Sequence, residues 1–383
     1  MPFQFRLLAV LVFKTLFCTR GTDARLTPKR ILVLLVLFPA YFLTLLTNWL
    51  CLWLDEVLFR GYRRQTVEKP LFIVGPPRTG STLLHRLLAG DEQFTSMKTW
   101  EILFAPSVVQ KRFWHGVGAL DRLVGRPLGR LVLAFEGWAL RDFNRMHHVG
   151  LFEPEEDDAI LHNVFATGLV ALVLPFREEV LPLVFFDEYM PAAERTKVMG
   201  FYRRCVQRHL HVFGRDKRFL SKNPTFSFKV VSLSEAFPDA GFICMARTPL
   251  ETVPSSFSFI SYFYDVFCSR GEDSPSRDFI FELLSAWYRY PVSKLRRLPE
   301  HQHMIVRYDE LVRDPKDVVL GCFERLGYVA GDTTRERLQG KTERARSFKS
   351  KHSYLFEELA LTPEQIAADY ADVIEDFGFQ QPS

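Results

Sequence analysis

The sequence contains little that would cross-link a fold or build a metal centre. Its six cysteines lie far apart, with no C-x-x-C pair and no spacing typical of metal ligands. We therefore expect reduced thiols in the core. The H-x-H pairs at 209/211 and 301/303 lack cysteine or carboxylate partners at metal-ligand spacing, so no metal site is predicted. No asparagine begins an N-x-[ST] acceptor, which favours a compartment without N-glycosylation.

A strong excess of positive charge is also missing. The net charge of +4 is scattered along the chain, which argues against a nucleic-acid partner. Internal repeats and low-complexity tracts are absent, and 48% hydrophobic with 25% charged residues is ordinary for a globular protein. At 383 residues the chain is long enough for a large core, and no pattern in it specifies an oligomeric state.

One long apolar segment lies near the N-terminus. Residues 31–54 contain no formally charged side chain, and this segment is long enough to cross a bilayer. Tyr41, Trp49 and Trp53 are residue types that suit the membrane interface. A shorter apolar stretch precedes it, and the absence of a small-residue cleavage site argues against a removable signal peptide. We expect membrane association through residues 1–66. The segment forms either a single span or a Pro39-kinked hairpin that lies in the interface or packs on the protein.

Residues 67–383 are expected to form the main domain. Basic residues flank both ends of the apolar segment, so the positive-inside rule gives no clear orientation. We expect the main domain in the cytoplasm, with the Golgi lumen as the alternative in a eukaryote.

Short apolar runs alternate with helical patterns in this domain. Strands are predicted at 71–75, 218–224, 240–247 and 304–308, each a short apolar or β-rich run. A helix is predicted directly after the first strand, from Ser81 to Ala89, and others fill the long segments between strands. The alternation predicts an α/β domain of the P-loop-containing nucleotide-binding class, with a mostly parallel sheet flanked by helices on both faces.

The first strand runs directly into a phosphate-binding sequence. FIVGPPRTGST places Gly75, Gly80 and Thr82 in the register of the P-loop G-x-x-x-x-G-K-[ST], but Ser81 occupies the lysine position and Arg78 is the only cation. The backbone amides of the turn and of the helix N-terminus form an anion cradle in either case. The missing lysine predicts an anionic ligand with no γ-phosphate to reach.

The strand at 240–247 carries a second signal. It ends in Arg247, where a magnesium-dependent NTPase would need a carboxylate to hold its metal. Arg247 and Ser255, in RTPLETVPS, would bracket a separate phosphate from the strand end and the following helix. A nucleotide with a 5′-phosphosulfate and a 3′-phosphate fits both features. The predicted co-substrate is therefore 3′-phosphoadenosine 5′-phosphosulfate (PAPS), bound without a metal.

These motifs resemble those of the PAPS-dependent sulfotransferases, most of all the bacterial-type branch related to the tyrosylprotein enzymes. GPPRTGSTLLHRLLA is similar to that family's 5′-phosphosulfate loop, and RTPLETVPS to its 3′-phosphate motif. TWE, EPEEDDAIL, SKNPTF and FKSKHSYLFEE follow in the family's usual order. The resemblance covers roughly residues 67–379. It departs at Ser81, where the family more often has threonine, but the hydroxyl is retained.

The resemblance implies a role for each residue of the two motifs. The 5′-phosphosulfate would be bound by Arg78, Thr79, Gly80, Ser81 and Thr82, and the 3′-phosphate by Arg247 and Ser255. Lys349 and Ser350 would close over the co-substrate, although a solvated basic loop explains these two residues equally well.

Sulfonyl transfer resembles phosphoryl transfer, so positioning and charge stabilisation are its main requirements. Arg78 and Lys222 are the cations placed to meet the charge that grows on the departing nucleotide. Glu101 is the predicted base, because the tyrosylprotein branch keeps its catalytic glutamate just past the first strand–helix unit. His147 and His148 are the alternative bases.

Two further acidic residues, Glu155 and Glu156, are interpreted as a helix N-terminus, where negative charge is favourable. The aromatic stretch at 255–267 would line an apolar acceptor channel or belong to the core.

The predicted function is a membrane-associated sulfotransferase that moves a sulfonyl group from PAPS to a hydroxyl of a small-molecule or lipid-like acceptor, without a metal. The alternatives are a P-loop kinase that uses ATP-Mg and an inactive membrane-anchored scaffold of the same fold.

Overall fold

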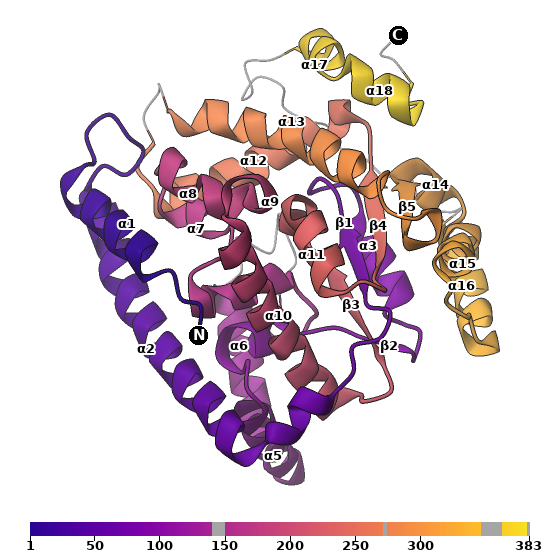
Figure 1. Ribbon diagram of the computed structural model, residues 1–383, viewed down its shortest axis with the longest axis horizontal. Helices are drawn as coiled ribbons and strands as arrows, with labels where there is room; N and C mark the ends of the chain where they lie inside the picture. The colour runs from indigo at the N-terminus through magenta and orange to yellow at the C-terminus, as the bar shows by residue number, and fades with distance from the viewer. Residues whose placement is uncertain (140–149, 271–273, 346–361, 381–383) are drawn as a thin grey trace.

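The computed structural model describes residues 1–139, 150–270, 274–345 and 362–380 (Figure 1). The strands are β1 (Leu71–Val74), β2 (Phe94–Thr95), β3 (Arg218–Lys222), β4 (Gly241–Ala246) and β5 (His303–Arg307). The helices up to β3 are α1 (Phe5–Phe17), α2 (Pro28–Leu58), α3 (Ser81–Leu88), α4 (Thr99–Phe104), α5 (Val108–Leu123), α6 (Pro127–Ala139), α7 (Val170–Val173), α8 (Arg177–Val184), α9 (Phe186–Tyr189) and α10 (Ala192–Phe213). The later helices are α11 (Val230–Ala236), α12 (Pro249–Phe267), α13 (Ser276–Leu295), α14 (Tyr308–Arg313), α15 (Pro315–Leu326), α16 (Asp332–Ala345), α17 (Pro363–Asp369) and α18 (Ala371–Phe377). The 3₁₀ turns are η1 (Arg60–Arg64), η3 (Asp157–Val164), η4 (Pro224–Lys229) and η5 (Glu300–Gln302).

The five strands form one parallel sheet in the order β2-β3-β1-β4-β5. All four strands predicted from the sequence are present, and β1 lies at the centre, as its fully buried side chains require. The strand that the sequence did not predict, β2, has two residues and pairs with the start of β3. The parallel arrangement brings the carboxyl ends of β1, β3, β4 and β5 to one edge of the sheet, where open α/β sheets bind ligands.

Each face of the sheet is covered by its own layer of helices (Figure 1). Leu71 and Ile73 of β1 point into a core built with side chains of α3, α14, α15 and α16. Phe72 and Val74 point to the opposite face and pack with α10, α11 and α13. This alternation buries both faces of the central strands, which is why β1 and β4 read as continuous apolar runs. The predicted α/β class, with a mostly parallel sheet flanked by helices, is confirmed.

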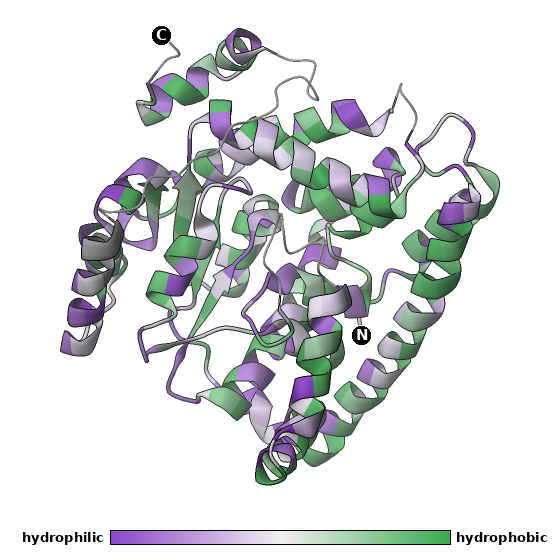
Figure 2. Ribbon diagram, turned by 180° about the vertical axis from the view of Figure 1, so that it is seen from behind, coloured by the Kyte–Doolittle hydropathy of each residue, from purple (hydrophilic) through white to green (hydrophobic). Residues whose placement is uncertain are grey.

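The apolar N-terminal segment forms the helix α2, which continues through Pro39. In the described part of the chain it is the one helix long and apolar enough to cross a membrane. The mean hydropathy of its most apolar stretch is 2.2, and only 17% of that stretch is buried. Figure 2 shows this helix as a long hydrophobic rod along one side of the molecule.

The inner side of α2 is fixed to the rest of the protein by polar contacts. Asn48 donates from Nδ2 to Asn163 Oδ1 at 2.9 Å. Asp55 accepts the backbone N–H of Val108 and Nε of Arg208, both at 2.8 Å. The structure therefore has α2 packed on the protein as one continuous helix, in place of the expected hairpin kinked at Pro39.

The division at residues 66 and 67 remains a prediction, and packing crosses it. Leu52 of α2 belongs to the same buried cluster as Val67 and the sheet residue Phe72. Leu11 of α1 belongs to a second cluster, which is built mainly from α8, α12 and α13.

Candidate active site

The loop between β1 and α3 is shaped by two glycines in the left-handed region. Gly75 has φ +113° and Gly80 has φ +84°, and a Cβ atom at either position would lie 2.4 Å from its neighbour. That neighbour is the carbonyl oxygen of Met245 for Gly75 and the ring of Tyr308 for Gly80. Only glycine fits so close an approach. The loop is thereby pressed against the ends of β4 and β5, and α3 begins at its last residues.

One hollow at the carboxyl edge of the sheet collects both predicted phosphate motifs. We call it the reaction hollow; its lining is Pro77, Arg78, Gly80, Ser81, Thr82, Leu83, Glu156, Lys222, Pro224, Arg247, Ser255, Phe259 and Tyr308. Ser81 and Thr82 open α3, so the first amides of that helix, which have no acceptor within it, lie at the hollow. Thr79 is the exception among the predicted loop residues. Its side chain is buried and donates to the carbonyl of Pro76 at 2.8 Å, which fixes the loop from within.

The cations of the two motifs meet in this hollow. Arg78 Nε donates to Ser255 Oγ at 3.0 Å, which joins the loop after β1 to helix α12. The guanidinium of Arg247 lies 4.3 Å from the centre of the Tyr308 ring and pairs with Glu251 one turn further along α12. Arg247 also reaches the carbonyl oxygen of Arg78 at 3.4 Å. Arg78 and Arg247, 169 residues apart in the chain, thus line one hollow.

The last residue of β3 supplies a third cation. Lys222 Nζ lies 3.2 Å from Glu156 Oε1 and 3.7 Å from Glu155 Oε1. Burial favours the neutral amine, but the two carboxylates, Glu156 above all, outweigh it and raise the pKa of Lys222. Lys222 is therefore a cation at neutral pH. Nearby, burial and the charge of Lys222 lower the pKa of His85 to about 3, so that imidazole is neutral.

The sequence matches the Sulfotransferase family over residues 70–330, which includes the loop, Lys222 and Arg247. This chain belongs to the sulfotransferase family.

Two kinds of relatives agree with this assignment. The omega-hydroxy-beta-dihydromenaquinone-9 sulfotransferases Stf3 of Mycobacterium bovis and Mycobacterium tuberculosis are each 26% identical over 360 residues, covering 89% of this chain and 83% of theirs. Among solved structures, sulfotransferase STF9 from Mycobacterium avium has a TM-score of 0.72 at 19% identity, covering 99% of this chain and 98% of its own. STF1 from Mycobacterium tuberculosis has a TM-score of 0.68 at 19% identity, covering 96% and 92%. These two structures share the fold.

The structure does not bring Glu101, the predicted base, into the reaction hollow of this sulfotransferase. Its side chain is 2% exposed and belongs to a separate buried cluster. Glu101 Oε2 lies 2.8 Å from Nδ1 of His209 and 3.6 Å from Nζ of Lys111, and Oε1 accepts the backbone N–H of Lys98 at 3.2 Å. Burial opposes ionisation, but His209 and Lys111 together outweigh it and lower the pKa of Glu101. The carboxylate is committed to internal partners, so its local sequence position misled the prediction.

Four predicted site residues lie outside the described residues. They are the alternative bases His147 and His148, and the residues predicted to close over the co-substrate, Lys349 and Ser350.

The sequence interpretation missed Glu156 as a site residue. It stands directly before the 3₁₀ turn η3, as interpreted, but its side chain lines the reaction hollow instead of capping that turn. The next two acids are buried and hold the segment: Asp157 accepts from Ser221 Oγ at 2.6 Å, and Asp158 pairs with Lys229 at 2.8 Å. The available signal is the run EEDD, of which the structure buries Asp157 and Asp158 and leaves Glu155 and Glu156 partly exposed.

A second, mainly apolar hollow adjoins the reaction hollow. Glu156, Pro224 and Phe259 line both, and beyond them the apolar hollow is walled by aromatic and aliphatic side chains such as Phe228, Phe263 and Trp287. Trp287 donates from Nε1 to the carbonyl of Pro224 at 2.8 Å, so its polar atom is already engaged.

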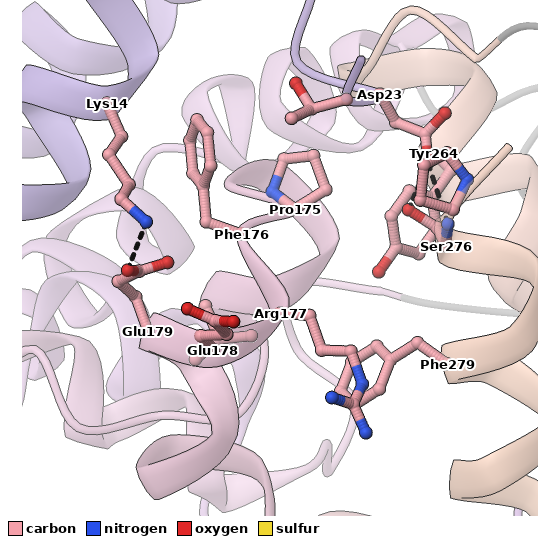
Figure 3. A pocket seen from close by; sticks show the side chains of 13 residues that line it. Lys14, Asp23, Pro175, Phe176, Arg177, Glu178, Glu179, Tyr264, Ser276 and Phe279 are labelled. Atoms are coloured by element: carbon pink, nitrogen blue, oxygen red, sulfur yellow. Dashed lines mark hydrogen bonds and ion pairs between the residues drawn. The ribbon is translucent and has the colours of Figure 1, made fainter. Parts of the chain in front are cut away.

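A third hollow lies between α1, α8 and α13 and contains none of the predicted site residues (Figure 3). Its rim is charged: Lys14 of α1 pairs with Glu179 of α8, and Arg177 and Glu178 lie beside them. Its polar side chains are mainly paired with one another, so we assign it to the packing of α1 on the protein.

Proposed function

We propose that this sulfotransferase moves a sulfonyl group from PAPS to a hydroxyl of a lipid-like acceptor and releases adenosine 3′,5′-bisphosphate, without a metal. The observation that carries the proposal is the position of Glu156 and Lys222. Glu156 lines both a cationic hollow that suits the donor and an apolar hollow that suits the acceptor, and Lys222 lies beside it in the cationic hollow.

The donor would lie along the carboxyl edge of the sheet. Its phosphosulfate end fits the first amides of α3, with Ser81 and Thr82 as hydroxyl donors and Arg78 as the cation. Its 3′-phosphate fits Arg247 and Ser255, which lie beside Tyr308. The ends of β3 and β4 carry cations where a kinase would place the carboxylate that holds magnesium, so the lining favours PAPS over ATP-Mg.

The chemistry needs one base and two cations. The acceptor oxygen forms a new bond to sulfur as the bond from sulfur to the bridging oxygen of the nucleotide breaks, and the acceptor proton passes to Glu156. Lys222 and Arg78 stabilise the charge that grows on the bridging oxygen. Lys222 holds the Glu156 carboxylate in position, since 3.2 Å separates the two charged groups. Glu156 replaces Glu101 in the proposed mechanism.

The acceptor is proposed to be lipid-like on two grounds. The hollow beyond Glu156 is walled by carbon, which favours an apolar molecule with its hydroxyl at one end. The Stf3 relatives are named for a hydroxylated menaquinone derivative, a molecule of that kind.

We also propose that the protein rests on a membrane through the outer side of α2. Leu35, Leu43 and Leu46 are each about two-thirds exposed there, which is a large apolar surface for water to cover. A separate span would have to break the contacts of Asn48 and Asp55, so an interfacial position suits this helix better. Leu35→Glu with Leu46→Glu should reduce sedimentation with phospholipid vesicles, whereas Val329→Glu, at an exposed site far from α2, should not.

The direct test of the proposed activity is incubation of the full chain with sulfur-labelled PAPS and a lipid extract. Mass spectrometry should show a lipid product heavier by one sulfonyl group. Transfer of labelled phosphate from ATP-Mg in its place would establish the kinase alternative. Binding of the nucleotide with no transfer to any acceptor would favour the inactive scaffold.

A further inference from the structure

The reaction hollow has an apolar continuation that leads toward α2. Pro77, Glu156, Pro224 and Phe259 line the reaction hollow and the apolar hollow alike, so the two adjoin at the proposed base. A molecule whose hydroxyl reached Glu156 would have its next atoms among carbon side chains.

A further groove lies beneath α2. Its walls are Phe38 and Tyr41 of that helix on one side and the segment 159–174 on the other. Leu169 lines this groove and also the apolar hollow, so a single half-buried side chain stands where the two meet. The three adjoining hollows thus lie in a row between α2 and Glu156.

Three of the four polar side chains that line the groove are turned to internal partners, and Thr44 is the fourth. Tyr41 donates its hydroxyl to the carbonyl of His162 at 2.9 Å, and Nδ1 of His162 lies 2.7 Å from the carbonyl of Ala159. Thr167 donates to Asp158 at 2.5 Å. Burial lowers the pKa of His162 to about 4, so the ring is uncharged at neutral pH. Apart from Thr44, the side-chain surface left for a ligand is hydrocarbon.

The same helix presents apolar side chains to the outside. Leu35 and Leu43 of α2 are exposed, whereas Phe38 and Tyr41 between them face the groove. A helix that contacts lipid on one side and lines an apolar groove on the other is suited to pass a hydrocarbon chain between them.

We propose that the groove beneath α2 binds the hydrocarbon tail of the acceptor, and that the acceptor's hydroxyl end reaches Glu156 through the apolar hollow, past Leu169. The inference rests on the proposed function for the direction of the acceptor, with hydroxyl inward and tail toward α2. The groove itself is a binding site for a long alkyl or prenyl chain drawn from the lipid phase.

The test uses two photoreactive hexadecanols, one with a diazirine beside the hydroxyl and one with it at the tail end. The full chain in phosphatidylcholine vesicles is irradiated with each, and labelled peptides are mapped by mass spectrometry. We expect the head probe to label peptides around Pro224 and Phe259, and the tail probe to label Phe38 and Tyr41. Excess unlabelled hexadecanol should remove both labels, whereas label on the lipid-exposed side of α2 should persist.

Leu169→Trp would narrow the junction of the two hollows. It should remove the head-probe label at Phe259, and it should lower kcat/KM for hexadecanol about tenfold relative to butanol. The matched control is Leu43→Trp, the same substitution on the outer side of α2. It should leave the head-probe label at Phe259 and the preference for hexadecanol over butanol unchanged. Affinity for adenosine 3′,5′-bisphosphate should be unaffected in both variants.

Head-probe labelling confined to the exposed side of α2, or unchanged by Leu169→Trp, would overturn the passage. An equal fall for hexadecanol and butanol would do the same, because it would make Leu169 a structural residue of the reaction hollow. Labelling as expected with no sulfonyl transfer from PAPS to any alcohol would instead refute the proposed function and leave the groove standing.

Discussion

Replacing Glu156 by glutamine is the sharpest mutation test of the proposed mechanism. The amide keeps the size of the side chain and an oxygen that can accept from Lys222, which now lies 3.2 Å from the carboxylate. It removes the group that takes the acceptor proton. A positioned general base contributes about 10²–10⁴-fold to rate. We therefore expect kcat to fall by about 10²-fold or more, which corresponds to at least about 3 kcal/mol of transition-state stabilisation.

Donor binding should survive this substitution. Glu155, with its carboxylate 3.7 Å from Lys222, still supports the lysine charge, and the hollow loses one negative group. Affinity for adenosine 3′,5′-bisphosphate should be unchanged or tighter by calorimetry. Because Glu156 is partly exposed, the melting temperature should also stay close to that of the parent protein.

The matched control is Glu155→Gln. This neighbour contacts the same lysine but does not line the reaction hollow, so its kcat should stay within about threefold of the parent value. Glu156 is not the base if Glu156→Gln turns over normally with labelled PAPS and an accepted alcohol, or if both variants lose activity equally.

Three further outcomes follow from the structure. Arg247→Ala should weaken bisphosphate binding by about 2 kcal/mol or more in calorimetry with little change in melting temperature; unchanged affinity would remove Arg247 from the site. Glu101→Gln should lower the free energy of unfolding by about 3–5 kcal/mol in urea titrations, because the buried charge of Lys111 would lose its carboxylate partner. A loss of activity with no loss of stability would instead restore Glu101 as the base. His85 has a folded pKa of about 3, below the unfolded value of 6.5, so stability is lost as the pH falls below 6.5. When the pH is lowered from 7.5 to 5, the free energy of unfolding measured in urea titrations should fall by about 2 kcal/mol less in His85→Asn than in the parent protein. An equal fall in the two proteins would contradict a neutral imidazole.

The phosphate loop could be predicted from sequence because its determinants are local. Gly75, Gly80 and the strand before them specify a turn whose amides point to one place, and the helix after it begins at the expected Ser81. Strands β1 and β4 were predictable for a similar reason, since a strand buried on both faces is a short apolar run. The two residues of β2 offer too little sequence for such a pattern.

The proposed base, Glu156, could not be found in this way, because its position depends on which segments meet in three dimensions. Glu101 follows the first strand–helix unit closely, but the start of α4 turns it toward His209 and Lys111. Glu156 comes from a segment with no regular pattern, and only the packing of η3 against β3 brings it to Lys222.

The position of α2 could not be predicted from its hydropathy either. The apolar composition of residues 31–54 indicates contact with lipid or core, but it cannot tell a span from a helix fixed along one side. Asn48 and Asp55 are the sequence signal for packing on the protein, because these polar groups need the partners that the structure gives them.

The central claim is that one hollow binds both ends of a 3′-phosphorylated adenosine nucleotide without a divalent ion. The most direct measurement is calorimetry of the full chain with adenosine 3′,5′-bisphosphate and with adenosine 5′-monophosphate, both in EDTA. We expect the bisphosphate to bind at least about tenfold tighter than the monophosphate, since only the bisphosphate has a 3′-phosphate for Arg247 and Ser255. Equal affinities, or binding of ATP that appears only when magnesium is added, would contradict it.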